Sequence, residues 1–202
     1  MAALSDLGYE VEVSDLYRMG FDATRAEAPK DEVERLCAAD LLILHFPIWW
    51  FAPPAMMKGW CDRALEHGVL HSSRARFDTG PMRGRQVLMC VSTGATEAEC
   101  GPDGREGDVR MQLWPLALTF RYCGYEVFAP ELVHGVHAYH DGAERDALET
   151  RLRGVLERQI DVVAGLAARP LIPFNRDTDF DDDGRLRAGA PAYSEFIRRR
   201  EI

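Results

Sequence analysis

Two short loops in the sequence contain residue types suited to binding a flat ring system. The first loop is Pro47-Ile48-Trp49-Trp50-Phe51 and the second is Ser92-Thr93-Gly94-Ala95. Each loop follows an apolar stretch of the sequence. Three consecutive aromatic residues cannot all face one core, because a strand sends neighbouring side chains to opposite faces and a helix spreads them around its axis. Aromatic rings offer a stacking surface, whereas small residues let a ligand approach backbone N–H groups closely. The two loops therefore suit a planar ligand that is rich in hydrogen-bond acceptors.

If the two loops lie side by side, they suit a flavin ring better than a sugar or a peptide. An aromatic plug that covers one end of a sheet would explain the same residues without any ligand. The residue types leave both interpretations open. The choice depends on the elements that position the loops.

Strand-like and helix-like segments alternate along the chain. Leu41 to Phe46 and Val87 to Val91 are almost continuously apolar, as expected for strands that are covered on both faces. Shorter strands are predicted at Glu10 to Val13 and at Glu126 to Phe128. The predicted helices are Met1 to Leu7, Pro29 to Ala38, a helix that begins at Pro53-Pro54, Val109 to Cys123 and Asp141 to Ala168. This alternation predicts an α/β fold in three layers, with ligands bound beyond the carboxyl ends of parallel strands.

Composition limits the classes of function. A chain of 202 residues is enough for one domain, and its net charge of -9 argues against nucleic-acid or anionic-membrane partners. The five cysteines are scattered without a C-x-x-C pair, which indicates free thiols and a cytoplasmic protein. The apolar runs are too short for membrane insertion, and no signal peptide is expected.

Four stretches of the sequence resemble one known family. They resemble motifs that occur in the same order in the flavodoxin-like NAD(P)H:quinone oxidoreductases, the DT-diaphorase group and its bacterial relatives. The four stretches are F-P-I-W-W-F-A-P-P-A-M-M-K-G-W, V-S-T-G-A, W-P-L and R-Y-C-G-Y-E-V. The similarity runs from about Gly8 to about Ala168. It implies a three-layer, flavodoxin-like parallel sheet with the family's strand order 2-1-3-4-5 and helices on both faces. It also implies a flavin-binding domain over residues 1–170 and an irregular C-terminal tail over residues 171–202.

The resemblance implies an NAD(P)H dehydrogenase (quinone). Such an enzyme transfers a hydride from NAD(P)H through bound FAD or FMN to a quinone, in two half-reactions of a ping-pong scheme. Trp50 and Phe51 would also line the substrate pocket, whereas Trp49 would stack on the flavin, pack inward or lie at a dimer contact. The residues assigned to the two edges of the flavin are Pro47, Ile48, Trp49, Trp50 and Phe51, and Ser92, Thr93, Gly94 and Ala95.

A homodimer is also implied, because the family's pocket is completed by both subunits. The stretch Val69 to Arg76 corresponds to a loop that reaches the partner's active site, which places His71 and Arg74 near the substrate. Trp60 and Trp114 either form the apolar centre of this interface or belong to the core.

Two positions depart from the animal members of the family, which have a Tyr and a His in the loop after the T-G motif. This sequence has Cys100 and Glu106 there, and these are the predicted catalytic residues. Glu106 would donate a proton if burial raised its pKa, and otherwise it is a solvent-facing carboxylate. Cys100 is either a redox thiol or a packing residue.

The beginning of the sequence is a further departure. Family members start with a strand and a loop that holds the flavin phosphate, whereas this sequence starts inside the following helix. Glu10 to Val13 would then be an edge strand without its central neighbour, and the strands beside the gap would have unpaired backbone groups. We therefore expect that about 20 to 30 native residues, roughly a strand, a loop and part of a helix, precede Met1.

Two patterns resemble metal sites. His134, His137 and His140 are spaced by three, but no carboxylate or cysteine pattern completes a site, so no metal is predicted. His137 remains a candidate at the edge of the substrate pocket. Asp179 to Gly184 resembles the first half of a calcium loop, but Ala190 occupies the position of the bidentate Glu. A solvated acidic turn is expected there.

Two alternatives to the reductase stay open. One is an ancillary regulatory subunit of a glutathione-gated potassium efflux system, because such flavodoxin-fold proteins keep the pocket. The other is a truncated form that has lost flavin binding. The sequence does not distinguish FAD from FMN, or NADH from NADPH, and it does not identify the physiological acceptor.

Overall fold

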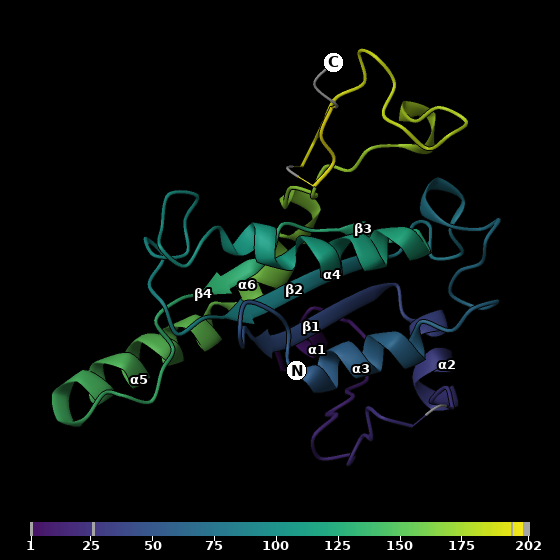
Figure 1. The fold of residues 1–202 in the computed structure, drawn as a ribbon. Helices are drawn as coiled ribbons and strands as arrows, with labels where there is room; N and C mark the ends of the chain where they lie inside the picture. Colours follow the sequence, from purple (N-terminus) through teal and green to yellow (C-terminus); the bar gives the residue numbers. More distant parts are fainter. Residues whose placement is uncertain (1, 26, 195, 200–202) are drawn as a thin grey trace.

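A four-stranded parallel sheet lies at the centre of the protein (Figure 1). The computed structural model describes residues 2–25, 27–194 and 196–199. β2 is the middle strand: it pairs with β1 over its whole length, with β3 near its start and with β4 at its end. The strands are β1 (Leu41–Pro47), β2 (Gln86–Ser92), β3 (Glu126–Val127) and β4 (Glu131–Val133). β3 and β4 form two pieces of one edge because Pro130, which has no N–H, interrupts the ladder between them.

Helices cover both faces of the sheet, as predicted. The helices are α1 (Ala2–Asp6), α2 (Lys30–Ala38), α3 (Ala55–Ala64), α4 (Val109–Cys123), α5 (Gly142–Glu157) and α6 (Gln159–Ala164). Val87, Met89 and Val91 of β2 pack in the core with α2, α3 and α4, whereas Leu88 and Cys90 pack on the opposite face with α1 and α6. The three-layer α/β architecture is therefore confirmed. In the described part of the chain, no helix has the length and apolarity needed to span a bilayer.

The predicted strand at Glu10 to Val13 is wrong. This segment is irregular and mostly exposed, and no described strand lies beside it. An alternating pattern produces a strand only where a ladder partner satisfies its backbone groups. The segment is anchored instead by a side chain, since the Ser14 hydroxyl donates to Glu32 Oε1 at 2.8 Å.

The single helix predicted from Asp141 to Ala168 is also wrong, because the chain breaks at Arg158 into α5 and α6. A 3-10 turn (Leu166–Ala168) follows α6. The break redirects the chain so that Val163 and Leu166 pack under the sheet, whereas α5 has no buried side chain and extends away from the body (Figure 1).

β1 is an edge strand in the described chain, although its apolar sequence is typical of a central strand. The Asp40 carbonyl accepts from Gln86, and the Ile48 N–H donates to Ser92, so the even-numbered backbone groups of β1 face β2. By alternation, Leu41, Ile43 and His45 direct their backbone groups away from β2. Within the described ranges these groups have no strand partner.

Candidate functional site

The aromatic loop after β1 is a tight turn that exposes three rings. The Trp49 N–H donates to the Ala52 carbonyl at 2.9 Å, and the Ala52 N–H donates to the Trp49 carbonyl at 3.2 Å. The two central residues, Trp50 and Phe51, have φ angles of 50° and 61°. Such angles are typical of type I′ turns, which favour Asn and Gly. The side chains of Trp49, Trp50 and Phe51 are 62%, 93% and 53% exposed.

This exposure decides against an aromatic plug, which would bury the rings. It also shows that Trp49 does not pack inward. Two bulky residues at positive φ store strain of about 1–3 kcal/mol each, and such strain is concentrated at functional sites. The loop therefore presents a stacking surface to a ligand or to another molecule.

The aromatic loop and the loop after β2 are neighbours. Pro47 and Ser92 end their strands as register partners, and the Ile48 N–H donates to the Ser92 carbonyl at 2.8 Å. Ile48 and Ala95 both pack against the main core. The predicted cofactor residues therefore lie together at the carboxyl ends of adjacent parallel strands.

The loop after β2 is held by hydrogen bonds and leaves two backbone donors without a described partner. Thr93 is only 5% exposed, and its hydroxyl donates to the Ala95 carbonyl at 2.9 Å. The same carbonyl accepts the Gly135 N–H at 2.9 Å. The N–H groups of Gly94 and Ala95 donate to no described atom, and Gly94 is exposed. Two adjacent N–H groups are thus available to an acceptor-rich edge of a ligand.

A third loop, after β4, completes the site. The Thr93 N–H donates to the Val133 carbonyl at 3.0 Å, and the Val136 N–H donates to the Thr93 carbonyl at 2.8 Å. A Cβ added at Gly94 would lie 3.9 Å from the His137 Cβ, which places His137 beside the predicted cofactor loop.

The other two histidines of this loop have separate neighbours. His134 contacts Thr93, and the His140 ring lies 4.3 Å from that of His137. In the described ranges no group of three or more His, Cys, Asp or Glu is arranged to hold a metal. The spacing of the histidines suggested only metal ligands and contained no signal for the contact between His134 and Thr93.

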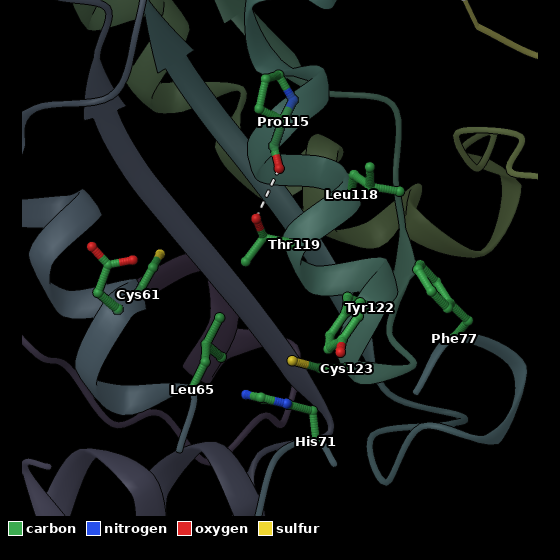
Figure 2. A pocket seen from close by; sticks show the side chains of 10 residues that line it. Cys61, Leu65, His71, Phe77, Pro115, Leu118, Thr119, Tyr122 and Cys123 are labelled. Atoms are coloured by element: carbon green, nitrogen blue, oxygen red, sulfur yellow. Dashed lines mark hydrogen bonds between the residues drawn. The ribbon is translucent and has the colours of Figure 1, made fainter. Parts of the chain in front are cut away.

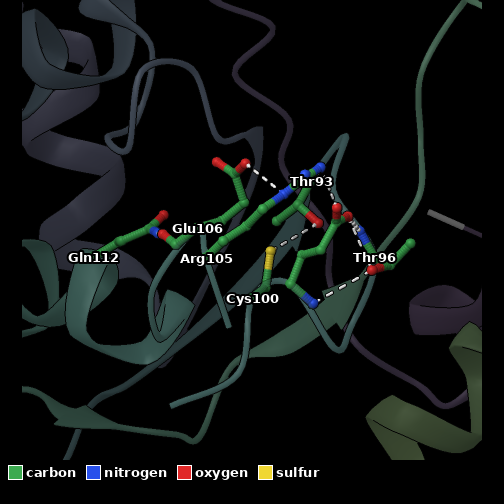
Figure 3. A network of polar contacts seen from close by, with 7 residues as sticks. Thr93, Thr96, Cys100, Arg105, Glu106 and Gln112 are labelled. Atoms are coloured by element: carbon green, nitrogen blue, oxygen red, sulfur yellow. Dashed lines mark hydrogen bonds and ion pairs between the residues drawn. The ribbon is translucent and has the colours of Figure 1, made fainter. Parts of the chain in front are cut away.

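The two predicted catalytic residues lie in the long loop before α4 (Figure 3). Cys100 is buried, and its Sγ lies 3.8 Å from Thr93 Oγ1 in the loop after β2. The Glu106 carboxylate is half-exposed and lies 3.8 Å from Arg105 Nε, without a hydrogen bond to Thr93 or Cys100. Arg105 also pairs with Glu99. The structure brings Cys100, but not the Glu106 carboxylate, to the Thr93 cluster.

The loop around Cys100 is held by a local carboxylate. Glu99 accepts hydrogen bonds from the backbone N–H and the hydroxyl of Thr96, both at 2.9 Å. These hydrogen bonds, together with the charge of Arg105, lower the pKa of Glu99 below its usual value. The carboxylate therefore stays ionised, and keeps its hydrogen bonds to Thr96, to a lower pH than an ordinary Glu would.

His71 lies in a groove of about 410 Å³ between α3 and α4 (Figure 2). Its ring is 5.3 Å from that of Tyr122 in an edge-to-face arrangement, and the Tyr122 ring is 5.0 Å from Phe77. The buried Nδ1 of His71 has no partner in the described part of the chain. Leu65, at the C-terminal end of α3, also lines this groove, whereas the aromatic loop precedes the N-terminal end of α3. Within one chain, His71 is therefore not brought to the two cofactor loops.

Trp60 and Trp114 are core residues of the single chain, and neither is exposed for a dimer interface. Trp60 is 4% exposed and donates from Nε1 to Glu32 at 2.8 Å. Trp114 is 7% exposed and is covered by Phe174 and Phe196 from the C-terminal segment, at ring distances of 5.0 and 6.1 Å. The predicted tail is irregular except for a 3-10 turn (Asp177–Asp179), and its residues 195 and 200–202 lie outside the described ranges.

Comparison with known proteins agrees with this geometry. A family model described as a flavodoxin-like fold matches residues 1–156. NAD(P)H dehydrogenase (quinone) 1 of Cavia porcellus is 33% identical over 165 residues, which cover 66% of this chain and 60% of the relative. The chain thus spans less than two thirds of that relative's length.

Two solved structures are similar over most of the chain. A Klebsiella pneumoniae protein, solved as a candidate quinone reductase, has a TM-score of 0.73 and 27% identity, covering 92% of this chain and 85% of that one. General stress protein 14 of Treponema denticola, solved in complex with FMN, has a TM-score of 0.60 and 27% identity. That match covers 80% of this chain and 86% of the other.

Proposed function

The chain belongs to the flavodoxin-like NAD(P)H:quinone oxidoreductase family, and on this basis we propose that it is a flavin-dependent NAD(P)H dehydrogenase (quinone). One observation supports this most directly: exposed, strained aromatic rings lie beside a loop with two free N–H donors. Both are at the carboxyl ends of parallel strands, where sheets of this kind bind nucleotide cofactors. The residues present fit the ring end of FAD or FMN.

The chain's own residues would bind and orient the reactants. The N–H groups of Gly94 and Ala95 would hold the acceptor-rich edge of the flavin, with Trp50 and Phe51 as its wall. The bound flavin would supply the hydride chemistry. NAD(P)H and the quinone would occupy the same face in turn, as in a ping-pong scheme, with His137 at the pocket edge. Proximity and stacking would then provide most of the rate enhancement.

We propose that a homodimer completes this pocket. In one chain, His71 and the aromatic loop lie at opposite ends of α3, and the groove around His71 is rich in aromatic rings. A second copy would place its groove over the aromatic loop and add its own His71 to the substrate pocket. We also propose a cytoplasmic location, because the five cysteines are free and a reducing compartment keeps thiols in that state.

The visible absorption spectrum tests the proposed function. The purified chain is incubated with FMN or FAD and desalted. We expect it to retain flavin bands that bleach with NADH or NADPH and return with a quinone. A colourless protein would contradict the proposal. Co-purification of such a protein with a potassium efflux system would support the regulatory subunit instead.

Glu106 is the proposed proton donor for quinone reduction, and Glu106→Gln tests it. Bleaching by NAD(P)H is expected to be unchanged, because hydride transfer to the flavin needs no donor. Recovery with a quinone should slow by about 100-fold, a typical contribution of a general acid. The exposed Glu97 in the same loop provides the matched control, Glu97→Gln, in which both steps should be normal. Equal recovery rates for the two variants would remove Glu106 from the mechanism. Cys100→Ser in the same assay shows whether its thiol is needed beyond packing.

A further inference from the structure

His134 reaches from the loop after β4 to a buried hydroxyl in the loop after β2. Its Nδ1 lies 2.9 Å from Thr93 Oγ1. The backbone joins the same two loops, because the Thr93 N–H donates to the carbonyl of Val133, the residue before His134. Residues that are far apart in the sequence are therefore joined at the centre of the proposed flavin site.

The hydroxyl of Thr93 has one proton and three neighbours. The Ala95 carbonyl can only accept, so the hydroxyl donates its proton there, at 2.9 Å. Cys100 Sγ approaches the same oxygen at 3.8 Å as a weak donor (Figure 3). With that proton directed at Ala95, the donor in the contact between His134 and Thr93 is Nδ1–H, which is one of the two tautomers that this contact allows. In this arrangement neutral His134 has its proton on Nδ1.

We infer that His134 is a positioning residue for the flavin loop and that it acts through Thr93. Its Nδ1–H keeps the Thr93 hydroxyl directed at the Ala95 carbonyl. That carbonyl belongs to the turn whose Gly94 and Ala95 N–H groups face the ligand. Two charged side chains of α5 reach the loop after β4: Arg151 donates to the His134 and Gly135 carbonyls at 2.9 and 3.1 Å, and a Glu144 carboxylate oxygen lies 3.0 Å from His140 Nδ1.

The tautomer can be measured on the wild-type chain without flavin. Nitrogen-15 NMR of the histidine rings above their pKa should show His134 protonated at Nδ1. This is the minor tautomer of free histidine in water, so it would be a specific signature of the contact. A ring protonated at Nε2 would overturn the inference. This readout does not depend on the proposed function.

The consequence for binding rests on the proposed function and is tested with two variants. His134→Leu removes the donor and should weaken flavin binding by about 10-fold, the worth of one hydrogen bond in a preorganised site. His134→Asn places an amide N–H near the position of Nδ1 and should restore most of that affinity. His45→Leu, which removes an exposed histidine of β1, is the control and should not change affinity. Fluorescence titration with FMN gives all four dissociation constants.

Equal losses in His134→Leu and His134→Asn would overturn the inference, because a donor at this position would then have no effect. Thr93→Val provides a second check, since it removes the hydroxyl at nearly constant volume. Combined with His134→Leu, it should add little to the loss from either single change. Absence of flavin binding by the wild-type chain would contradict the proposed function, while the tautomer would still test the contact.

Discussion

The double variant Trp50→Asn/Phe51→Gly is expected to be more stable than the wild type and about 100-fold weaker in flavin binding. Both residues have positive φ, which Asn and Gly adopt at little cost. Trp50 is 93% exposed, so its removal sacrifices little buried surface. Relief of strain should increase the free energy of unfolding by about 2 kcal/mol and raise Tm by roughly 4–8 °C. Loss of two stacking rings, at about 1–3 kcal/mol each on planar bases, accounts for the lost affinity.

Urea unfolding and FMN titration measure the two effects on the same samples. The control is Tyr17→Asn, because Tyr17 is an aromatic residue outside the site that is 84% exposed and has no positive φ. This variant should change neither stability nor affinity appreciably. A less stable double variant would show that contacts, and not strain, dominate the turn. An unchanged affinity for FMN would remove Trp50 and Phe51 from the proposed flavin site.

Glu32→Ala is expected to lose about 2–3 kcal/mol of unfolding free energy, a large share of the stability of a typical domain. Glu32 is 3% exposed and accepts from Ser14 and from Trp60 Nε1, each at 2.8 Å. It also forms an ion pair with Arg35. Without this carboxylate, a buried indole N–H and part of a guanidinium have no acceptor. Because Trp60 belongs to α3, which follows the aromatic loop, flavin binding should weaken as well.

The exposed Glu34 on the same helix gives the matched control. Glu34→Ala should change the free energy of unfolding by no more than about 0.5 kcal/mol in urea titration. Glu32→Gln keeps an acceptor for Trp60 but removes the charge, so its loss should be intermediate. Trp60→Phe removes the donor and, combined with Glu32→Ala, should show strong coupling between the two residues. A loss below about 1 kcal/mol in Glu32→Ala would mean that water enters and replaces the carboxylate.

Much of the fold was predictable from the sequence because its signals are local. The apolar runs at Leu41 to Phe46 and Val87 to Val91 are β1 and β2, and α4 has the predicted bounds Val109 to Cys123. Helix ends are set by neighbours a few residues away, as where Gly124 ends α4 with a φ of 103°. The motif after β1 and the one after β2 likewise predicted two loops that the structure places side by side at the carboxyl ends of their strands.

Features that depend on partners far apart in the chain were decided only by the tertiary structure. Glu10 to Val13 has the pattern of a strand but no ladder partner in the described chain, so it stays irregular. Trp60 is buried because Glu32 of another helix accepts its N–H. The pairing of β4 with β2 brings His134 to Thr93, 41 positions away. Periodicity and capping are determined by neighbouring residues, whereas these contacts depend on strand register and helix packing, which no local pattern specifies.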